Sequence, residues 1–288
     1  MSQIKKQNIT ALILVHNEEI HLERCIKNLI KNVKKIIVID SFSKDKSINI
    51  CQKYKIKFFK RKFIDHSTQL NWALKKIDFK TNWILRIDAD EIVEKNFFNK
   101  FNKIKNKKKY NGIDLNIDHI FLGDKINYGG VYPQNQIRIW KKNKGYFDKS
   151  PMDEKIIIHK KLIYKSNLKI IDFNLKGLKF WVKKHYRYAN KEAEFYNILV
   201  NNKFKTNQNI KNKILYYKFP IFLRVFLLFL YRYIIKKGFL DGYVGLKFSL
   251  DGNELKENVF FQKSTFSYIP QNPTIFQTSI QDNITLFD

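Results

Sequence analysis

Two spacing patterns of apolar residues, one typical of buried strands and one of helices, alternate along the first 90 residues. Short runs rich in apolar residues predict buried strands, and they occupy Ile9–Val15, Ile36–Ile39, Ile56–Phe59 and Trp83–Ile87. Between these runs, apolar residues recur at intervals of three and four, which predicts helices that bury one face. These positions are Leu22, Cys25, Ile26, Leu29, Ile30 and Val33, then Ile48 and Cys51, and then Leu70, Ala73, Leu74 and Ile77. Strands alternating with helices predict an α/β fold with a mostly parallel, Rossmann-like sheet flanked by helices.

Polar residues at the starts of the first two helices predict how they are capped. Asn17 is expected to be the N-cap of the first helix, with Glu18 and Glu19 in its first turn, where the helix dipole favours acids. Ser41 or Ser43 is expected to cap the second helix.

The pattern changes after about residue 110. Ile113–Phe121 and Gln136–Trp140 are predicted strands around a glycine-containing loop, and residues 180–200 are predicted to be helical. The most hydrophobic stretch, Ile214–Ile235, is interrupted by Lys218, Arg224 and Arg232, so it is a poor membrane-spanning helix. It is either an interfacial helix on a membrane or a packing helix of the domain.

Composition narrows the function classes. The 288 residues carry a formal charge of +29, which suits an anionic partner such as nucleic acid, anionic lipid or a phosphorylated glycan. The alternative is that the charge reflects a lysine-rich composition without a specific partner. The two cysteines exclude a disulfide scaffold and favour a reducing compartment. The first eight residues lack the apolar run of a signal peptide, so a cytoplasmic location is expected.

Acidic residues follow the predicted strands where ligands bind in such sheets. Glu18 and Glu19 follow the first strand, Asp40 ends the second, and Asp88-Ala89-Asp90-Glu91 follows the fourth. Carboxylates in an Asp-x-Asp pair can hold Mg²⁺ or Mn²⁺ together with a substrate diphosphate, and simple helix capping is the alternative. Neither Gly-x-Gly-x-x-Gly nor a P-loop motif is present, which disfavours dinucleotide-binding proteins and P-loop NTPases.

Several segments together resemble glycosyltransferase family 2 of the GT-A fold. They are Val15-His16-Asn17-Glu18-Glu19, Ile36–Asp45, Gln69–Leu74 and Trp83–Glu91. Gly129–Trp140 and Gly238–Gly245 are similar to motifs of the subgroup that adds a sugar to the lipopolysaccharide inner core. The likeness extends from residue 8 to about 250. It departs from the family at Phe42 and Lys46, which replace glycines, and at Asp153, which replaces a histidine.

The resemblance implies an inverting transfer from a UDP-sugar, a UDP-hexose in that subgroup, to an anionic lipid-linked glycan at the inner face of the cytoplasmic membrane. It places Glu19 and Asp40 at the nucleoside, and Asp88 and Asp90 at the ribose and the Mg²⁺ or Mn²⁺ ion. Glu154 would be the general base, with Asp153 as the reserve candidate.

Other side chains have two open interpretations each. Arg138 should face away from Ile137 and Ile139, where it would clamp a phosphate or form a surface ion pair. Tyr132 would belong to an acceptor platform with Tyr128 and Trp140, although packing explains Trp140 equally well. His159 and His185 would be a third metal ligand or, more simply, ordinary partly buried histidines.

The chain is therefore predicted to comprise a GT-A domain over residues 1–205, a helical extension over 206–250 and a tail over 251–288. Phe266–Ile284 resembles the Q-loop region of an ABC-transporter ATPase without its Walker motifs, so the tail is interpreted as a non-functional fragment. The rival hypotheses are a nucleic-acid-binding protein, disfavoured by the acids at strand ends, and a sugar nucleotidyltransferase, disfavoured because no glycine-rich loop follows the first strand.

Overall fold

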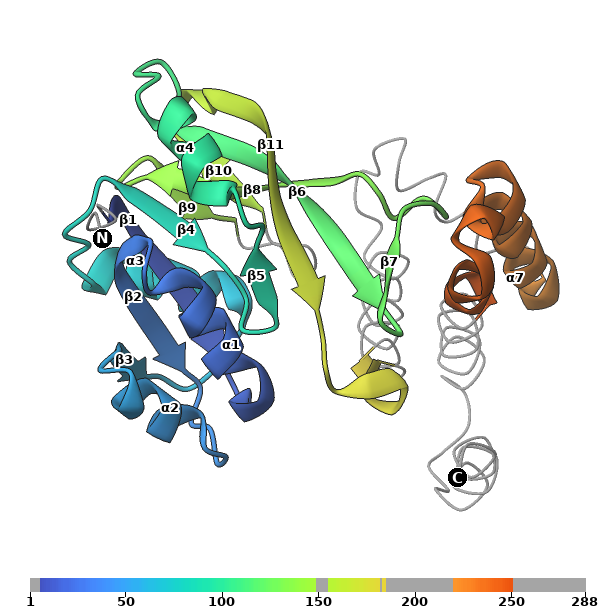
Figure 1. Ribbon diagram of the computed structural model, residues 1–288, viewed down its shortest axis with the longest axis horizontal. Helices are drawn as coiled ribbons and strands as arrows, with labels where there is room; N and C mark the ends of the chain where they lie inside the picture. Colours follow the sequence, from blue (N-terminus) through green and yellow to red (C-terminus); the bar gives the residue numbers. More distant parts are fainter. Residues whose placement is uncertain (1–5, 149–154, 182, 185–219, 251–288) are drawn as a thin grey trace, which may run out of the picture. The chain divides into compact units, whose positions relative to one another are not determined.

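A computed structural model of the chain describes residues 6–148, 155–181, 183–184 and 220–250 (Figure 1). Its contacts divide the chain into two compact units. The first comprises Met1–Val182 and Leu227–Asp251, and the second Lys183–Phe226 and Gly252–Asp288. The ABC-like fragment and most of the predicted helix over residues 180–200 lie outside the described residues.

A sheet dominates the first unit. Within the described residues it has nine strands, eight of them in the order β3-β2-β1-β4-β8-β6-β11-β5, with β7 paired to β6. The strands are β1 (Gln7–Val15), β2 (Val33–Asp40), β3 (Lys57–Lys60), β4 (Trp83–Arg86), β5 (Glu91–Val93), β6 (Gly112–Phe121), β7 (Asp124–Ile126), β8 (Gln134–Lys141) and β11 (Ile163–Phe173). Two further strands, β9 (Gly145–Phe147) and β10 (Ile156–Ile158), form a separate antiparallel pair.

The strands differ in direction between the two halves of the sheet. β3, β2, β1 and β4 are parallel to one another, which confirms the prediction from the first 90 residues. β8 is antiparallel to both β4 and β6, whereas β11 is parallel to β6 and antiparallel to β5. The result is an α/β sheet whose first half is doubly wound and whose second half is mixed.

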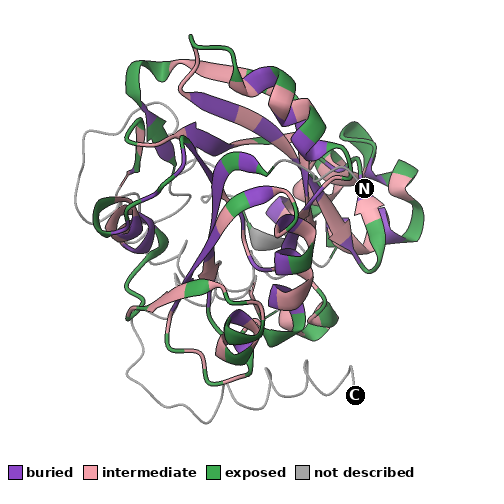
Figure 2. Cartoon of the chain, turned by 60° about the vertical axis from the view of Figure 1, so that its left-hand side comes forward, coloured by how far each residue is buried: buried purple, intermediate pink, exposed green. Residues whose placement is uncertain are grey.

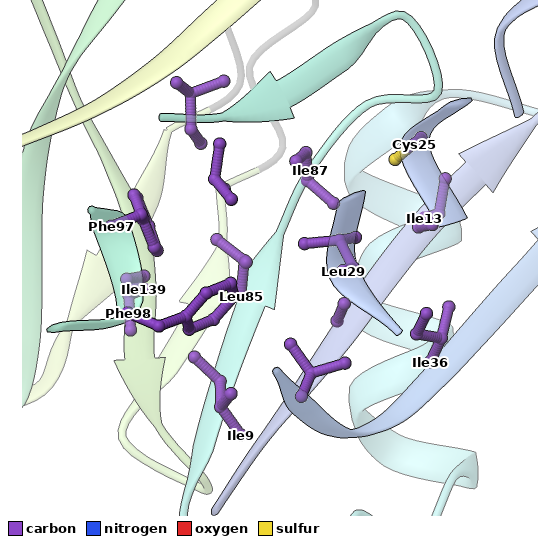
Figure 3. Packing of buried hydrophobic residues seen from close by; sticks show 14 of the residues in the cluster. Ile9, Ile13, Cys25, Leu29, Ile36, Leu85, Ile87, Phe97, Phe98 and Ile139 are labelled. Carbon is purple, nitrogen blue, oxygen red and sulfur yellow. The ribbon is translucent and has the colours of Figure 1, made fainter. Parts of the chain in front are cut away.

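Helices cover the sheet because each has one apolar face. They are α1 (Glu19–Leu29), α2 (Ser47–Lys53), α3 (His66–Lys76) and α4 (Phe97–Lys105). On one face, α1 and α4 pack on the β1 residues Ile9, Ala11 and Ile13 (Figure 3). On the other face, α3 and the β9–β10 pair pack on Leu12 and on β2. Side chains of β1 thus enter both cores in alternation, and the central strands are largely buried (Figure 2).

The predicted caps of α1 and α2 were wrong. Glu18, not Asn17, precedes α1, and Asn17 has a φ of 55° in the left-handed region. Lys46 precedes α2, with no side-chain cap from Ser41 or Ser43. The physical reason is that the two loops bond to each other, as described below.

The described part of the C-terminal region begins with α7 (Ile221–Leu230), which continues into a π-helical turn, η2 (Tyr231–Ile235), and a 3₁₀ turn, η3 (Gly238–Asp241). No helix in residues 220–250 or elsewhere in the described chain is long and apolar enough to cross a membrane. Gly238 and Gly245 approach so closely that a Cβ on Gly245 would collide with the Gly238 carbonyl oxygen, which requires glycine there.

Candidate active site

The acids of the first four strands gather at one edge of the sheet. β1 lies between β2 and β4, Val15 lies opposite Asp40, and Leu12 lies opposite Arg86. Asp40 and Asp88 therefore flank the end of β1 on its two sides. This is the carboxyl edge of the parallel strands, where ligands bind in open α/β sheets.

Two loops at this edge are bonded to each other. The Asn17 side chain accepts a hydrogen bond from the Lys44 backbone (2.8 Å), and the Asn17 backbone donates to Ser43 Oγ (2.9 Å). The Glu19 backbone donates to Asp45 Oδ2 (2.8 Å), so Asp45 supplies the missing cap of α1 from the neighbouring loop. Backbone amides at a helix start need an acceptor, and here that acceptor is distant in sequence.

The two acids expected at the nucleoside belong to this loop pair. Glu19 is exposed, and its Oε2 accepts from the Lys46 backbone (2.9 Å). Asp40 is fully buried, and both its oxygens accept from the Ser43 backbone (3.3 and 3.2 Å). Each carboxylate therefore stabilises the β2–α2 loop, in addition to any contact with a ligand.

The turn after β4 carries the Asp-x-Asp pair beside two arginines. Asp88 Oδ2 lies 3.3 Å from Arg138 Nη1, and Asp88 Oδ1 lies 3.6 Å from Arg86 Nε. Burial raises the pKa of Asp88, but the guanidinium groups of Arg86 and Arg138 outweigh burial and hold that pKa below its usual range. Asp88 is therefore ionised at neutral pH.

Glu91 completes this cluster and was not predicted from the sequence as a functional residue. Its side chain is 4% exposed; Oε1 accepts from Arg138 Nη2 (2.8 Å) and Oε2 from the Asp88 backbone (2.8 Å). Burial raises the pKa of Glu91 to about 8; the Arg138 charge lowers it in part, and the neighbouring Asp88 charge raises it. Glu91 thus holds both Arg138 and the turn that carries Asp88.

The structure gives Arg138 a place that neither sequence interpretation described. Its side chain is 6% exposed and lies between Asp88 and Glu91. The β6–β8 ladder skips Arg138, since consecutive residues Ile113 and Asp114 pair with Ile139 and Ile137. This is a β-bulge, and it turns the guanidinium toward the acidic turn. Arg138 forms a buried ion pair rather than the surface pair considered above.

Asp90 is held through both its backbone and its side chain. Its carbonyl oxygen accepts from the Phe173 backbone (3.1 Å) and from Arg24 Nη2 (2.9 Å), and its Oδ2 accepts from Asn174 Nδ2 (2.9 Å). Within the described residues, no three His, Cys, Asp or Glu side chains are grouped to hold a metal ion. Asp88 and Asp90 are nevertheless hard oxygen donors, and Mg²⁺ commonly uses one or two carboxylates plus substrate phosphates.

The remaining predicted residues are not all near this edge. Glu154 and Asp153, and also His185, lie outside the described residues. His159 follows β10, and its carbonyl accepts from Asn111, next to the start of β6. That end of β6 pairs with Trp140, which lies opposite Ile84 near the start of β4, so His159 lies at the other edge of the sheet from Asp88.

The glycine-containing loop before Tyr132 contacts the C-terminal segment instead. The Tyr132 ring is half-buried, with Lys125 Nζ 4.7 Å from its centre. Asp241 accepts from the backbones of Asn127 (3.0 Å) and Tyr128 (2.8 Å), and the Gly129 backbone donates to the Lys236 carbonyl (3.0 Å). The structure thus joins two motifs that are more than 100 residues apart in the sequence.

A second polar cluster lies beside Glu91 and was also missed. His119 Nδ1 lies 3.0 Å from Asp172 Oδ2, its Nε2 contacts Gln134 Oε1, and Asp172 is opposite Glu91 in the sheet. Burial lowers the pKa of His119, but the hydrogen bond and charge of Asp172, together with Gln134 and Glu91, outweigh burial, and the pKa is raised. Only the pairing of β6, β8 and β11 brings these residues together, so no local sequence signal predicts them.

Comparison with known proteins assigns the chain that carries this site to a protein family. A family model described as Glycosyl transferase family 2 matches residues 10–159. A protein of Rickettsia bellii described as an uncharacterized glycosyltransferase is 35% identical over 96 residues, which are 33% of this chain and 32% of that protein. The chain therefore covers about a third of that relative's length.

Solved structures are similar at low sequence identity. S. aureus TarS in complex with UDP-GlcNAc has 12% identity, a TM-score of 0.44 and coverage of 92% of this chain and 93% of that chain. Glucosyl-3-phosphoglycerate synthase from Mycobacterium tuberculosis, solved with Mn²⁺ and UDP, has 15% identity, a TM-score of 0.33 and coverage of 40% and 45%. The family model spans more than half of the residues and includes Asp40, Asp88, Asp90 and Arg138. The chain belongs to glycosyl transferase family 2.

Proposed function

We propose that the protein is a nucleotide-sugar-dependent glycosyltransferase that inverts the configuration of the transferred sugar. The observation that carries the proposal is the acidic turn at the carboxyl edge of the sheet, with Asp88 and Asp90 beside Asp40 inside the family match. We further propose a UDP-hexose donor and a lipid-linked glycan acceptor such as a lipopolysaccharide core.

In this proposal the residues of the turn have separate tasks. Asp40 and Glu19 lie on the nucleoside side, where their hydrogen bonds to the β2–α2 loop also shape the pocket wall. Asp90, with Asp88, would hold a Mg²⁺ or Mn²⁺ ion, and that ion would neutralise charge on the leaving diphosphate. Since both Asp88 oxygens face arginines, Asp90 is the stronger candidate for direct ligation.

The hydroxyl group of the acceptor glycan must lose its proton during the transfer, so a general base is needed. Glu154 would take the proton from the acceptor hydroxyl as that oxygen attacks the sugar from the face opposite the diphosphate, with Asp153 as the reserve candidate. A single displacement with this arrangement requires no covalent intermediate and leaves the new bond in the inverted configuration.

Thermal unfolding tests the proposal, because a ligand of the folded state raises the melting temperature. UDP, GDP and CDP should be compared, each with Mn²⁺ and with EDTA, followed by transfer assays using labelled UDP-hexoses. We expect UDP with Mn²⁺ to raise Tm more than either component alone. No rise with any nucleotide diphosphate, with or without metal, would contradict the proposal.

We also propose contact with the cytoplasmic membrane face through residues 227–250. Eight large apolar side chains of this segment are 44–70% exposed: Leu227, Tyr231, Ile234, Ile235, Phe239, Leu240, Tyr243 and Leu250. Four cations accompany them, and the one acid, Asp241, is bonded to the backbone of Asn127 and Tyr128. Exposed aromatic and aliphatic side chains with cations suit an anionic lipid surface.

Vesicle sedimentation tests this contact. Ile235→Ser combined with Tyr243→Ser replaces two of the most exposed apolar side chains, 67% and 70%, so folding should be preserved. We expect the double variant to lose binding to vesicles containing phosphatidylglycerol. Equal binding of variant and wild type would contradict membrane contact through this segment.

The carboxylates at the strand ends favour the glycosyltransferase function over a nucleic-acid-binding function. The net charge of +29 attracts any polyanion, but the carboxylates gathered at the strand ends would repel nucleic-acid phosphates unless a cation lay between them.

A further inference from the structure

A short segment after β11, Asn174–Lys176, crosses the carboxyl edge of the sheet, and we refer to it as the strap. No motif of the sequence assigns it a role. At one end, Asn174 Nδ2 donates to Asp90 Oδ2 (2.9 Å), and Asn174 Oδ1 accepts from the Lys176 backbone (2.9 Å). The Asn174 amide is therefore fixed by its own segment while it bonds to the side chain of the proposed metal ligand.

The other end of the strap is bonded to the loop before α1. Lys176 Nζ donates to Glu18 Oε1 (2.8 Å) and to the Asn17 carbonyl (3.1 Å), and the Leu175 backbone donates to Nε2 of the fully buried His21 (2.8 Å). Since Nε2 accepts a hydrogen bond, the proton of the neutral ring lies on Nδ1, which donates to Glu18 Oε2 (2.6 Å). One carboxylate thus receives both Lys176 and His21.

We propose that the strap is a positioning element of the donor site, in which Asn174 orients the carboxylate of Asp90 for the cation. The inference rests on the proposed nucleotide-sugar function. Outer hydrogen-bond partners of a ligating carboxylate fix its orientation, and their loss typically weakens metal binding by about 10–100-fold. Lys176 and His21 keep the strap attached to the β1–α1 loop, so that Asn174 stays in place.

The contacts of Asp90 separate this role from a purely structural one. The Asp90 backbone is held independently of Asn174, because its carbonyl accepts from the Phe173 backbone and from Arg24. Loss of the Asn174 amide should therefore release the Asp90 side chain while the turn keeps its shape. Asn174 is only partly buried, so its truncation leaves no large cavity.

The test measures Mn²⁺ binding by isothermal titration calorimetry, alone and with saturating UDP, on Asn174→Ala. The matched control is Asn28→Ala, because the Asn28 amide bonds only to the backbone of Val93 (2.9 and 3.2 Å) in the contacts described. We expect Asn174→Ala to weaken Mn²⁺ binding at least 10-fold with little change in Tm. We expect Asn28→Ala to lower Tm with unchanged Mn²⁺ affinity.

A second variant keeps the test decisive if Asn174→Ala does not fold. Asn174→Asp would place a second carboxylate against Asp90 Oδ2, a repulsion that a divalent cation relieves, so Mn²⁺ should raise its Tm by more than it raises that of the wild type. Unchanged Mn²⁺ affinity in Asn174→Ala, or an unchanged Mn²⁺-induced rise in Asn174→Asp, would overturn the positioning role. A wild type that binds neither Mn²⁺ nor UDP would overturn the proposed function and the strap's role with it.

Discussion

Replacement of Arg138 by methionine tests whether the site depends on the buried ion pair with Glu91. Arg138→Met leaves Glu91, which is 4% exposed, without its counter-ion. Removing one partner of a buried pair typically costs about 3–5 kcal/mol of stability. Methionine fills much of the same volume, so the loss of charge dominates over the loss of packing.

The pH dependence of that cost follows from the raised pKa of Glu91. In the variant the buried carboxyl should take up a proton on folding, whereas in the unfolded chain it titrates near its ordinary value of about 4.3. Above that value the folded state binds more protons than the unfolded state, so stability falls as pH rises, by about 1.4 kcal/mol per pH unit, until the folded pKa is passed. The wild type should lose stability over the same range, because the pKa of Glu91 is already raised to about 8 with Arg138 present. Arg138 lowers that pKa, so its removal extends the loss to higher pH, and Arg138→Met should be more impaired relative to the wild type at pH 9 than at pH 7.

Urea unfolding at pH 7, 8 and 9 measures this difference. The control is the double variant Arg138→Met with Glu91→Gln, in which position 91 cannot titrate but can still accept from the Asp88 backbone. The double variant should lose the pH slope and recover part of the stability lost in the single variant. A single variant that loses less than about 1 kcal/mol at pH 9, with no increase in that loss between pH 7 and pH 9, would refute the dependence on a buried Glu91–Arg138 pair.

Three other predictions concern chemistry and titration. Asp90→Ala should abolish the Mn²⁺-dependent rise in Tm with UDP while the protein stays folded, as judged by circular dichroism. Glu154→Gln should lower kcat by about 10²–10⁴-fold with donor affinity unchanged, and loss of turnover in Asp153→Asn alone would move the base to Asp153. The pKa of His119 is raised in the folded protein, mainly by Asp172. The stability that protonated His119 contributes to the fold should therefore be complete below pH 6.5 and lost as pH rises through the folded pKa. His119→Gln should not show this loss in urea unfolding.

The sheet of the first 90 residues could be predicted because its strands are buried on both faces. Continuous apolar runs then mark the strands, and observed β1, β2, β3 and β4 each overlap the predicted run. The edge that carries Asp40 and Asp88 follows from the strand order, since parallel strands end at the same side. The location of the candidate site was thus accessible from local patterns.

The contacts of individual side chains could not be predicted from the sequence in the same way. Arg138 was expected to oppose Ile137 and Ile139 on the other face, but the bulge places Ile139 in the core that contains α1 and α4 and Ile137 against the other core. Asn17 was expected to cap α1, yet it bonds to the β2–α2 loop. Both outcomes depend on a partner strand or loop, which a single sequence pattern does not contain.

The charges of the acidic turn support the proposed cation at this point. Asp88 and Glu91 contact Arg86 and Arg138, and the Asp90 carboxylate, which accepts from Asn174, adds a third carboxyl group to the turn. A diphosphate approaching Asp90 would be repelled at short range, although the +29 surface attracts it from a distance. A divalent cation reverses the local sign and leaves the arginines paired with Asp88 and Glu91. The long-range field and the local cluster thus have opposite signs, and binding of UDP should depend on Mn²⁺ more strongly than its approach rate depends on salt.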